Sequence, residues 1–282
     1  MYNTNQKRVA AIHDISCFGK CSLTVALPII SSVGIECSVI PTAILSTHTG
    51  GFSGYTFRDL TDDILPIANH WKKEGIEVDA VYTGYLGSKE QVSIVMEAAN
   101  IIKKDGGMTV VDPVMADHGK LYGGFPEDFP KEMRKLCEVA DIITPNITEA
   151  VLMLGMEFKQ PPHSKEYVEE IIEELSKMTS AKIVLTGVCF DGENIGAATY
   201  ENGKTEYVFE KKVDAAYHGT GDVFTSCLLS AVLNGKDLKE AAQIACEFTA
   251  ACIKYTKENE PNMKYGVDFE GRTPLLLKKL GL

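Results

Sequence analysis

The sequence lacks several features that would assign it to a particular class of protein. No stretch approaches the ~18 consecutive apolar residues of a membrane span, so we expect no membrane partner. The segment Met1–Arg8 is polar and has no apolar signal-peptide core, which predicts a cytoplasmic location. Low-complexity tracts, long polar linkers and internal repeats are also missing. We therefore expect residues 1–282 to form one domain.

An excess of basic charge is missing as well. The chain has 28 Lys and Arg residues against 39 Asp and Glu residues, a formal net charge of -11. Because proteins that bind phosphate backbones need basic patches, this balance argues against nucleic acid as a main partner. With 45% apolar and 24% charged residues, the composition is that of an ordinary globular protein.

The cysteines form no metal-binding or disulfide pattern. Cys17 and Cys21 are four residues apart, but no second Cys or His pair completes a zinc site. The other six are scattered, most of them in apolar stretches. In a reducing compartment such cysteines behave as small buried hydrophobes, and we expect that role here.

Two common nucleotide-binding motifs are absent. No Gly-x-Gly-x-x-Gly pattern follows the first expected strand. The run Gly203-Lys204-Thr205 resembles the end of a Walker A loop, but Ala198 stands where that motif needs its first glycine. The run also lies in an expected hairpin and not before a helix, so we reject it as a phosphate loop.

Strand and helix patterns alternate along most of the chain, which predicts an α/β fold with a mostly parallel central sheet and helices on both faces. A hairpin with an Asn202-Gly203 turn interrupts the alternation. Ser22 is the expected N-cap of the first helix, and residues 105–107 form an expected turn. Strands are expected at 8–15, 37–45, 78–83, 108–111, 141–144, 182–185, 194–200 and 205–210, and helices at 22–32, 59–73, 89–104, 130–138, from 146, 165–177, 223–233, 238–255 and from 274.

The tetrapeptide Gly219-Thr220-Gly221-Asp222 immediately precedes a strongly helical segment. Its glycines permit close backbone approach to a ligand, and the N–H groups of the helix that follows form an anion site. Carboxylate repels phosphate, so the position of Asp222 calls for a reason. We interpret Asp222 as a base that takes a proton from a hydroxyl while the glycine turn holds the phosphoryl group under attack.

Polar residues gather after the expected strands, where ligands of parallel sheets bind. Each alone is equally a cap or turn residue, but together they indicate a site. Asn146 and Glu149 have capping-box spacing, and Glu149 also suits water-mediated Mg²⁺ binding. His48 is open to two interpretations, general acid or turn residue, and His13 is expected to be a hydrogen-bonded core histidine. The strand-end set is Asp14, Thr49, Tyr85, Asp112, Asp117, Thr144, Asn146, Glu149, Thr186 and Gly187.

The chain resembles the ribokinase-like small-molecule kinases and, within them, the pyridoxal kinases. The likeness rests on five segments spread along nearly the whole chain. They are Ser46-Thr47-His48-Thr49-Gly50, Thr83-Gly84-Tyr85-Leu86-Gly87-Ser88, Asp112-Pro113-Val114-Met115, Asp141-Ile142-Ile143-Thr144-Pro145-Asn146 with Glu149, and Gly219-Thr220-Gly221-Asp222.

The resemblance implies a three-layer sandwich that phosphorylates the 5′-hydroxyl of pyridoxal, pyridoxine or pyridoxamine with ATP. Asp222 would be the base, and Gly219, Thr220 and Gly221 the anion hole. ATP would meet Asp112, Asp117, Thr144, Asn146, Glu149, Thr186 and Gly187, with Asp112 and Glu149 serving Mg²⁺, in part through water. Asp14, His48, Thr49 and Tyr85 would contact the vitamer. The likeness also implies a homodimer and K⁺ as a further ion.

Asp14 departs from the family pattern, in which a serine contacts the pyridine ring. A carboxylate there suits a protonated ring nitrogen or an amine, which leaves the preferred vitamer open. The alternatives are a hydroxymethylpyrimidine kinase of thiamine synthesis, with the same chemistry on another ring, and a non-catalytic vitamer-binding protein. An intact Asp222 and glycine turn argue against the latter, since a pure binder needs no base.

Overall fold

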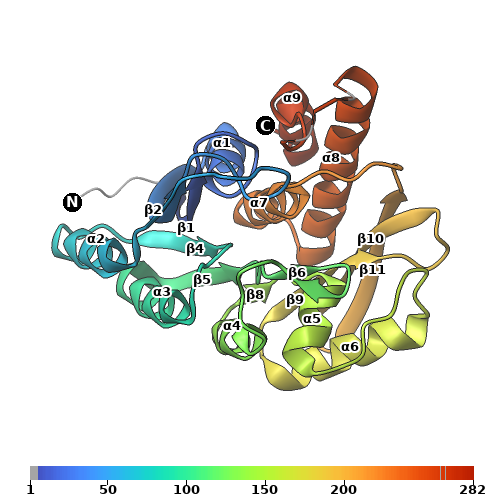
Figure 1. The fold of residues 1–282 in the computed structure, drawn as a ribbon, viewed down its shortest axis with the longest axis horizontal. Helices are drawn as coiled ribbons and strands as arrows, with labels where there is room; N and C mark the ends of the chain where they lie inside the picture. Colours follow the sequence, from blue (N-terminus) through green and yellow to red (C-terminus); the bar gives the residue numbers. More distant parts are fainter. Residues whose placement is uncertain (1–5, 261, 264) are drawn as a thin grey trace.

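The computed structural model describes residues 6–260, 262–263 and 265–282. Within them, nine strands form one sheet in the order β11-β10-β9-β8-β5-β4-β1-β2-β3 (Figure 1). Strands β9, β8, β5, β4, β1 and β2 run parallel, β3 is antiparallel to β2, and β10 and β11 form an antiparallel hairpin beside β9. The strands are β1 (Arg8–Ser16), β2 (Glu36–Leu45), β3 (Phe57–Asp59), β4 (Val78–Thr83), β5 (Lys103–Val111), β8 (Ile142–Ile143), β9 (Lys182–Val188), β10 (Asn194–Glu201) and β11 (Lys204–Lys211).

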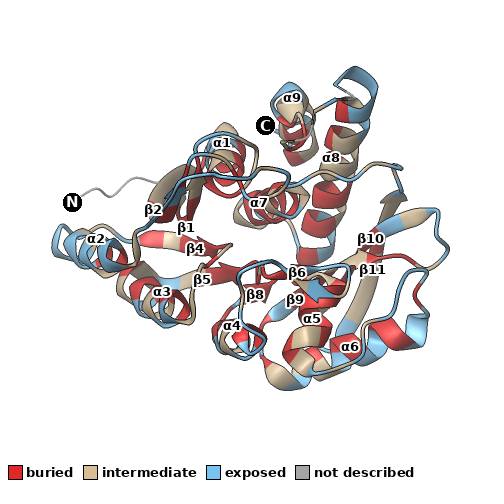
Figure 2. Cartoon of the chain, in the orientation of Figure 1, coloured by how far each residue is buried: buried red, intermediate tan, exposed pale blue. Residues whose placement is uncertain are grey.

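Helices cover both faces of the sheet, and each face has its own apolar cluster, which confirms the predicted three-layer arrangement. One face carries α2 (Thr61–Lys73), α3 (Lys89–Ile102), α4 (Phe129–Glu138), α5 (Ile147–Leu154) and α6 (Lys165–Met178). The other carries α1 (Leu23–Ser32), α7 (Thr220–Leu233), α8 (Leu238–Asn259) and α9 (Thr273–Leu280). Buried residues concentrate on the strands and on the helix sides that face them (Figure 2). No helix in the described part of the chain is long and apolar enough to cross a membrane.

Several local predictions are confirmed. The strand at 78–83 has the expected bounds, and the hairpin turns at Asn202 and Gly203, whose φ angles of 52° and 78° suit a tight two-residue turn. The tail helix from Pro274 is also present, as α9. These elements depend on short-range signals, which explains why the sequence predicts them well.

Other local predictions are wrong. Residues 105–107 do not separate helix from strand, because α3 ends at Ile102 and β5 runs from Lys103, with a register shift against β4. Ser22 precedes α1 but makes no side-chain cap, since its φ of 55° and ψ of -129° differ from ordinary capping geometry. The helix expected from residue 59 begins at Thr61, because Asp59 belongs to β3.

Four short elements have no counterpart in the predictions. They are β3, the small hairpin of β6 (Ala116–Asp117) and β7 (Lys120–Leu121), and a 3₁₀ turn at Glu270–Arg272. Each is only two or three residues long, which is too short to show a period of its own. The β6–β7 hairpin follows the end of β5 after a four-residue connection, at the edge where the parallel strands end.

Candidate active site

The sheet has a topological switch point between β1 and β4. The chain passes from β1 to β2 on one side and returns to place β4 on the other. Pairing of β1 with β4 ends at Ile12 and Thr83, so the two strands separate beyond these residues. Crevices at switch points are where open α/β sheets bind ligands, and both Asp14 and Tyr85 follow this one.

The first turn of α7 lies at this edge of the sheet. Gly219 is its N-cap, with φ of 77°, and a Cβ there would lie 1.9 Å from the Lys20 carbonyl oxygen. Only glycine fits this backbone and this approach. Helix α7 begins at Thr220, and its first N–H groups have no partner within the helix. The turn therefore has the geometry of an anion site.

Asp222 lies in that first turn and is half-buried. Burial raises the pKa of its carboxyl to about 7, the charge of Asp14 adds to the shift, and the backbone amide of Ser22 opposes it. A carboxylate with a pKa near the working pH is suited to accept a proton from a hydroxyl. The local chemistry thus agrees with the role proposed for Asp222.

Asp112 lies beneath the same turn, directly after β5. Its side chain is buried, and its Oδ2 accepts a hydrogen bond of 3.3 Å from the Thr225 hydroxyl of α7. A Cβ on Gly221 would lie 3.8 Å from the same Oδ2. Burial and the charge of Asp222 raise the pKa of Asp112, and the Thr225 hydroxyl opposes the shift. The structure therefore brings Asp112 to the glycine turn and Asp222.

Glu149 is buried at the start of α5 and completes the expected capping box. Its Oε2 accepts from the Asn146 amide at 2.9 Å, and the Glu149 amide donates to Asn146 Oδ1 at 2.9 Å. Its Oε1 accepts from the Met115 amide at 3.1 Å. Burial and the charge of Asp112 raise the pKa of Glu149. The structural interpretation of Glu149 is thus confirmed, and its carboxylate also lies near a second acid.

The two buried carboxylates of Asp112 and Glu149 fit a hard divalent cation, which would relieve the cost of burying both charges. In the described residues no group of three or more His, Cys, Asp or Glu side chains is arranged around a common point. Mg²⁺ tolerates this arrangement, because it usually keeps several waters and takes phosphate oxygens as its remaining ligands.

Tyr122, after the β6–β7 hairpin, is a site residue that the sequence did not single out. Burial raises the pKa of its hydroxyl, and so do the charges of four acids around it: Glu149, Asp117, Asp112 and Asp222. Asp117 itself is exposed in the hairpin, where its Oδ1 accepts from the His118 amide at 2.7 Å. The 117–124 loop therefore lies beside the acidic site, with the 43% exposed Tyr122 close enough to sense its acids.

The remaining residues that were expected on the nucleotide side follow β8 or lie near the end of β9. The hydroxyls of Thr144 and Thr225 are 3.0 Å apart, which places Thr144 in the Asp112 group. Asn146 and Thr186 pair through their backbones, so the two strand ends are adjacent. Gly187 has a φ of 77° and open space where a Cβ would be.

The residues that were expected to contact the vitamer are less closely connected to one another. Asp14 is buried and accepts a 3.2 Å hydrogen bond from the Ser16 hydroxyl. Burial of Tyr85 raises the pKa of its hydroxyl to about 12, and the charge of Asp14 contributes to this shift. His48 Nδ1 accepts from the Gly50 amide at 3.1 Å, so the turn role of His48 is realised. Thr49 is exposed, and no side-chain hydrogen bond in the described residues joins it to the other candidates.

A second histidine, His218, was missed although it immediately precedes the glycine turn. Its ring centroid lies 5.3 Å from that of His48, and a Cβ on Gly50 would meet its ring at 2.4 Å. Burial, with a smaller effect of His218, lowers the pKa of His48. The turn at Gly219 is thus in contact with the loop that follows β2.

His13 is fully buried as expected, but the expected hydrogen bonds are absent. Neither ring nitrogen has a partner in the described residues, and burial lowers the pKa of His13 to about 3. Its ring lies edge-on to Tyr82, with centroids 4.3 Å apart. A Cβ on Gly84 would lie 2.5 Å from the imidazole, so the glycine leaves room for it.

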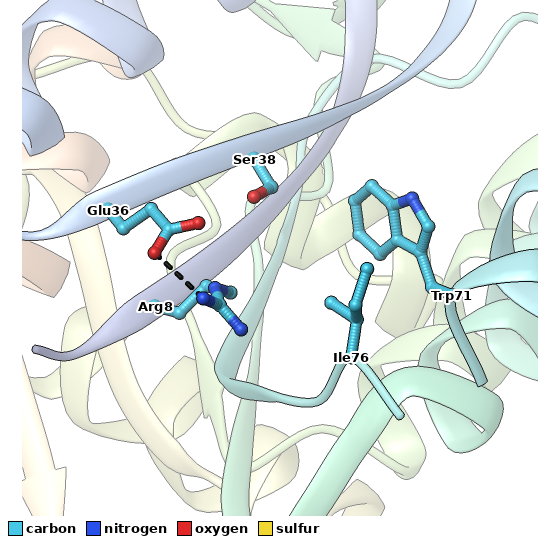
Figure 3. A pocket seen from close by; sticks show the side chains of 5 residues that line it. All are labelled: Arg8, Glu36, Ser38, Trp71 and Ile76. Atoms are coloured by element: carbon cyan, nitrogen blue, oxygen red, sulfur yellow. Dashed lines mark hydrogen bonds and ion pairs between the residues drawn. The ribbon is translucent and has the colours of Figure 1, made fainter. Parts of the chain in front are cut away.

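A cavity of about 250 Å³ lies at the opposite edge of the sheet, where β1 and β2 begin (Figure 3). The Arg8 guanidinium pairs with Glu36 at 2.9 Å on one side, and Trp71 and Ile76 stand on the other. Neither the glycine turn nor any strand-end acid lines it. The cavity is therefore separate from the candidate active site.

The comparisons with known proteins agree with this geometry. The sequence matches the phosphomethylpyrimidine kinase family over residues 27–267. Pyridoxine kinase of Bacillus subtilis is 32% identical over 187 residues, covering 64% of this chain and 66% of that protein. Pyridoxal kinase of Lactobacillus plantarum superposes with a TM-score of 0.88 at 27% identity, over 98% of each chain. A Bacteroides thetaiotaomicron protein crystallised with pyridoxal gives 0.90 at 35% identity, over 99% of this chain and 96% of that one.

The chain belongs to the phosphomethylpyrimidine kinase family. Its fold is the ribokinase-like sandwich of the pyridoxal kinases, as the sequence predicted. Within the family, the relatives confirm the prediction of a pyridoxal kinase enzyme over that of a non-catalytic binding protein.

Proposed function

We propose that this protein transfers the γ-phosphoryl group of ATP to the 5′-hydroxyl of a vitamin B6 vitamer. One observation carries the proposal: Asp222, whose pKa is about 7, lies in the first turn of α7, whose free N–H groups form an anion site. A base and an anion hole at one helix terminus are what an in-line attack of a hydroxyl on a phosphoryl group requires.

In this mechanism Asp222 accepts the hydroxyl proton as the oxygen attacks phosphorus. The amides from Gly219 to Gly221 and the α7 dipole stabilise the charge on the transferring group. Asp112 and Glu149 would hold Mg²⁺ directly or through water, and the ion would supply positive charge to neutralise the phosphates. Asp117, Thr144, Asn146, Thr186 and Gly187 surround the nucleotide, and Tyr122 covers it from the loop side.

The vitamer binds in the crevice between β1 and β4. Asp14 and Tyr85 lie against the ring there, with His48 and Thr49 on the loop after β2. Because Asp14 is a buried carboxylate, it favours a vitamer that carries a positive charge, such as a protonated ring nitrogen or the ammonium of pyridoxamine. One kinase domain spanning residues 1–282, a homodimer, K⁺ as a second ion and a cytoplasmic location complete the proposal.

The test is ATP consumption with pyridoxal, pyridoxine, pyridoxamine and hydroxymethylpyrimidine, measured side by side with Mg²⁺ present. We expect the vitamers to have the higher kcat/KM. A preference for the pyrimidine would assign the protein to the neighbouring branch of its family. Vitamer binding by calorimetry without ADP formation would refute the phosphotransfer itself.

A further inference from the structure

Thr225 has an unusual environment for a threonine within a helix. It is 1% exposed, and its hydroxyl donates to Asp112 Oδ2 at 3.3 Å. The same hydroxyl lies 3.0 Å from the hydroxyl of Thr144, at the end of the neighbouring strand. Thr225 thus joins the base-bearing helix α7 to the ends of β5 and β8.

Buried Ser and Thr hydroxyls in helices commonly bond back to the carbonyl four residues earlier. Two others in this protein do so: Ser230 donates to the Ser226 carbonyl at 2.7 Å, and Thr256 to the Cys252 carbonyl at 2.8 Å. Thr225 instead directs its hydroxyl out of the helix to a carboxylate. Its orientation is therefore not explained by helix structure alone.

The position of Thr225 on α7 gives this contact a consequence. It lies three residues after Asp222, so the two side chains project from the same side of the helix, about one turn apart. In the proposed mechanism Asp222 faces the hydroxyl to be phosphorylated, and Thr225 contacts Asp112, the acid assigned to the nucleotide side. A single rigid element thereby sets the spacing between the base and Asp112.

We propose that Thr225 is a positioning residue, which holds the Asp112 carboxylate in the orientation that engages a magnesium–nucleotide complex. The inference deepens the proposed function and rests on its assignment of Asp112 to the nucleotide side. Groups that orient metal-binding carboxylates typically contribute 10–100-fold to metal affinity. Valine at this position keeps the shape of threonine and leaves the buried Asp112 Oδ2 without this donor.

The experiment is calorimetric titration with ADP, in the presence of Mg²⁺ and in EDTA, without any vitamer. Thr225→Val should weaken Mg·ADP binding about tenfold or more, and leave metal-free ADP binding within about twofold. Thr225→Ser keeps the hydroxyl and should bind Mg·ADP within about threefold of wild type. Ser230→Ala, on the same helix with a hydroxyl bonded inside it, is the matched control and should bind as wild type does.

Mg·ADP binding by Thr225→Val at the wild-type level would overturn the proposal. An equal loss in EDTA would also overturn it, because the effect would then not depend on the metal side. If Thr225→Ser were as weak as Thr225→Val, packing of the methyl group and not the hydroxyl would be responsible. Thermal unfolding checks that each variant is folded. Since no vitamer enters the titration, a failure of the vitamer assignment would leave these results unchanged.

Discussion

Replacement of Asp222 by asparagine tests the catalytic base. Asparagine fills nearly the same volume but cannot accept the hydroxyl proton as a carboxylate does. General base catalysis contributes typically ~10²–10⁴-fold, so we expect kcat to fall by that factor. Nucleotide binding should persist, since the proposed anion site consists of backbone amides from Gly219 onward, which this substitution leaves in place.

The pKa of Asp222 adds a second, sharper expectation. With a pKa of about 7, the carboxyl is ionised in roughly nine-tenths of molecules at pH 8 and about one-tenth at pH 6. Because the ionised form is the base, wild-type kcat/KM for the vitamer should fall nearly tenfold between these two values. The residual activity of Asp222→Asn should lack this dependence.

A coupled ADP-release assay between pH 5.5 and 9, with saturating Mg·ATP, measures both effects. Calorimetry with ADP confirms that the variant still binds nucleotide. Near wild-type turnover of Asp222→Asn would refute the base assignment. A wild-type profile that stays flat down to pH 5.5 would contradict the raised pKa, and therefore the physical account of how burial prepares this carboxylate.

Further predictions concern stability, the vitamer and the glycine turn. The folded-state pKa of Asp222 is raised, so ionisation of this carboxyl lowers the stability of the protein as pH rises from about 4 to about 7. In denaturant unfolding at pH 8, Asp222→Asn should therefore be more stable than wild type by roughly 1–3 kcal/mol. At pH 5.5 this difference in stability should be smaller. Asp14→Ser should lower kcat/KM for pyridoxamine about tenfold more than for pyridoxal, as expected for losing a charge-assisted contact with the ammonium. Equal losses would contradict the ammonium contact and leave the shared ring nitrogen as the partner of Asp14. Gly219→Ala should lower the free energy of unfolding by ~2 kcal/mol or more, because the new Cβ would meet the Lys20 carbonyl oxygen. The same substitution should lower kcat ~10²-fold by displacing the amides of the anion hole. An unchanged unfolding free energy and an unchanged kcat would refute the anion-hole geometry.

Sequence reasoning succeeded where the signal was local. The Asn146–Glu149 capping box and the Asn202-Gly203 turn each depend on residues within a few positions of one another, and both formed as expected. The glycine turn before α7 could also be predicted from the local sequence, because its positive φ angle at Gly219 is one that glycine adopts readily. Parallel topology then followed from the alternation of strands and helices, and with it the gathering of acids at one edge.

Sequence reasoning failed where distant segments determine a residue's role. Thr225 and Asp112 are 113 positions apart, and nothing near Thr225 indicates that its hydroxyl leaves the helix. Tyr122 is linked to the site only through the charges of acids on three other segments, which raise the pKa of its hydroxyl. Ser22 is a residue type that commonly caps helices, but its backbone conformation prevents its side chain from forming the cap hydrogen bond. Such roles arise from tertiary packing, which overrides local preference.

Phosphorus NMR of the product tests the central claim most directly. Wild-type protein incubated with pyridoxine, ATP and Mg²⁺ should give one new phosphomonoester signal, coupled to the methylene protons of the 5′ carbon, and Asp222→Asn should give almost none in the same time. Absence of this signal with every vitamer, or faster phosphorylation of hydroxymethylpyrimidine in direct competition, would contradict the account.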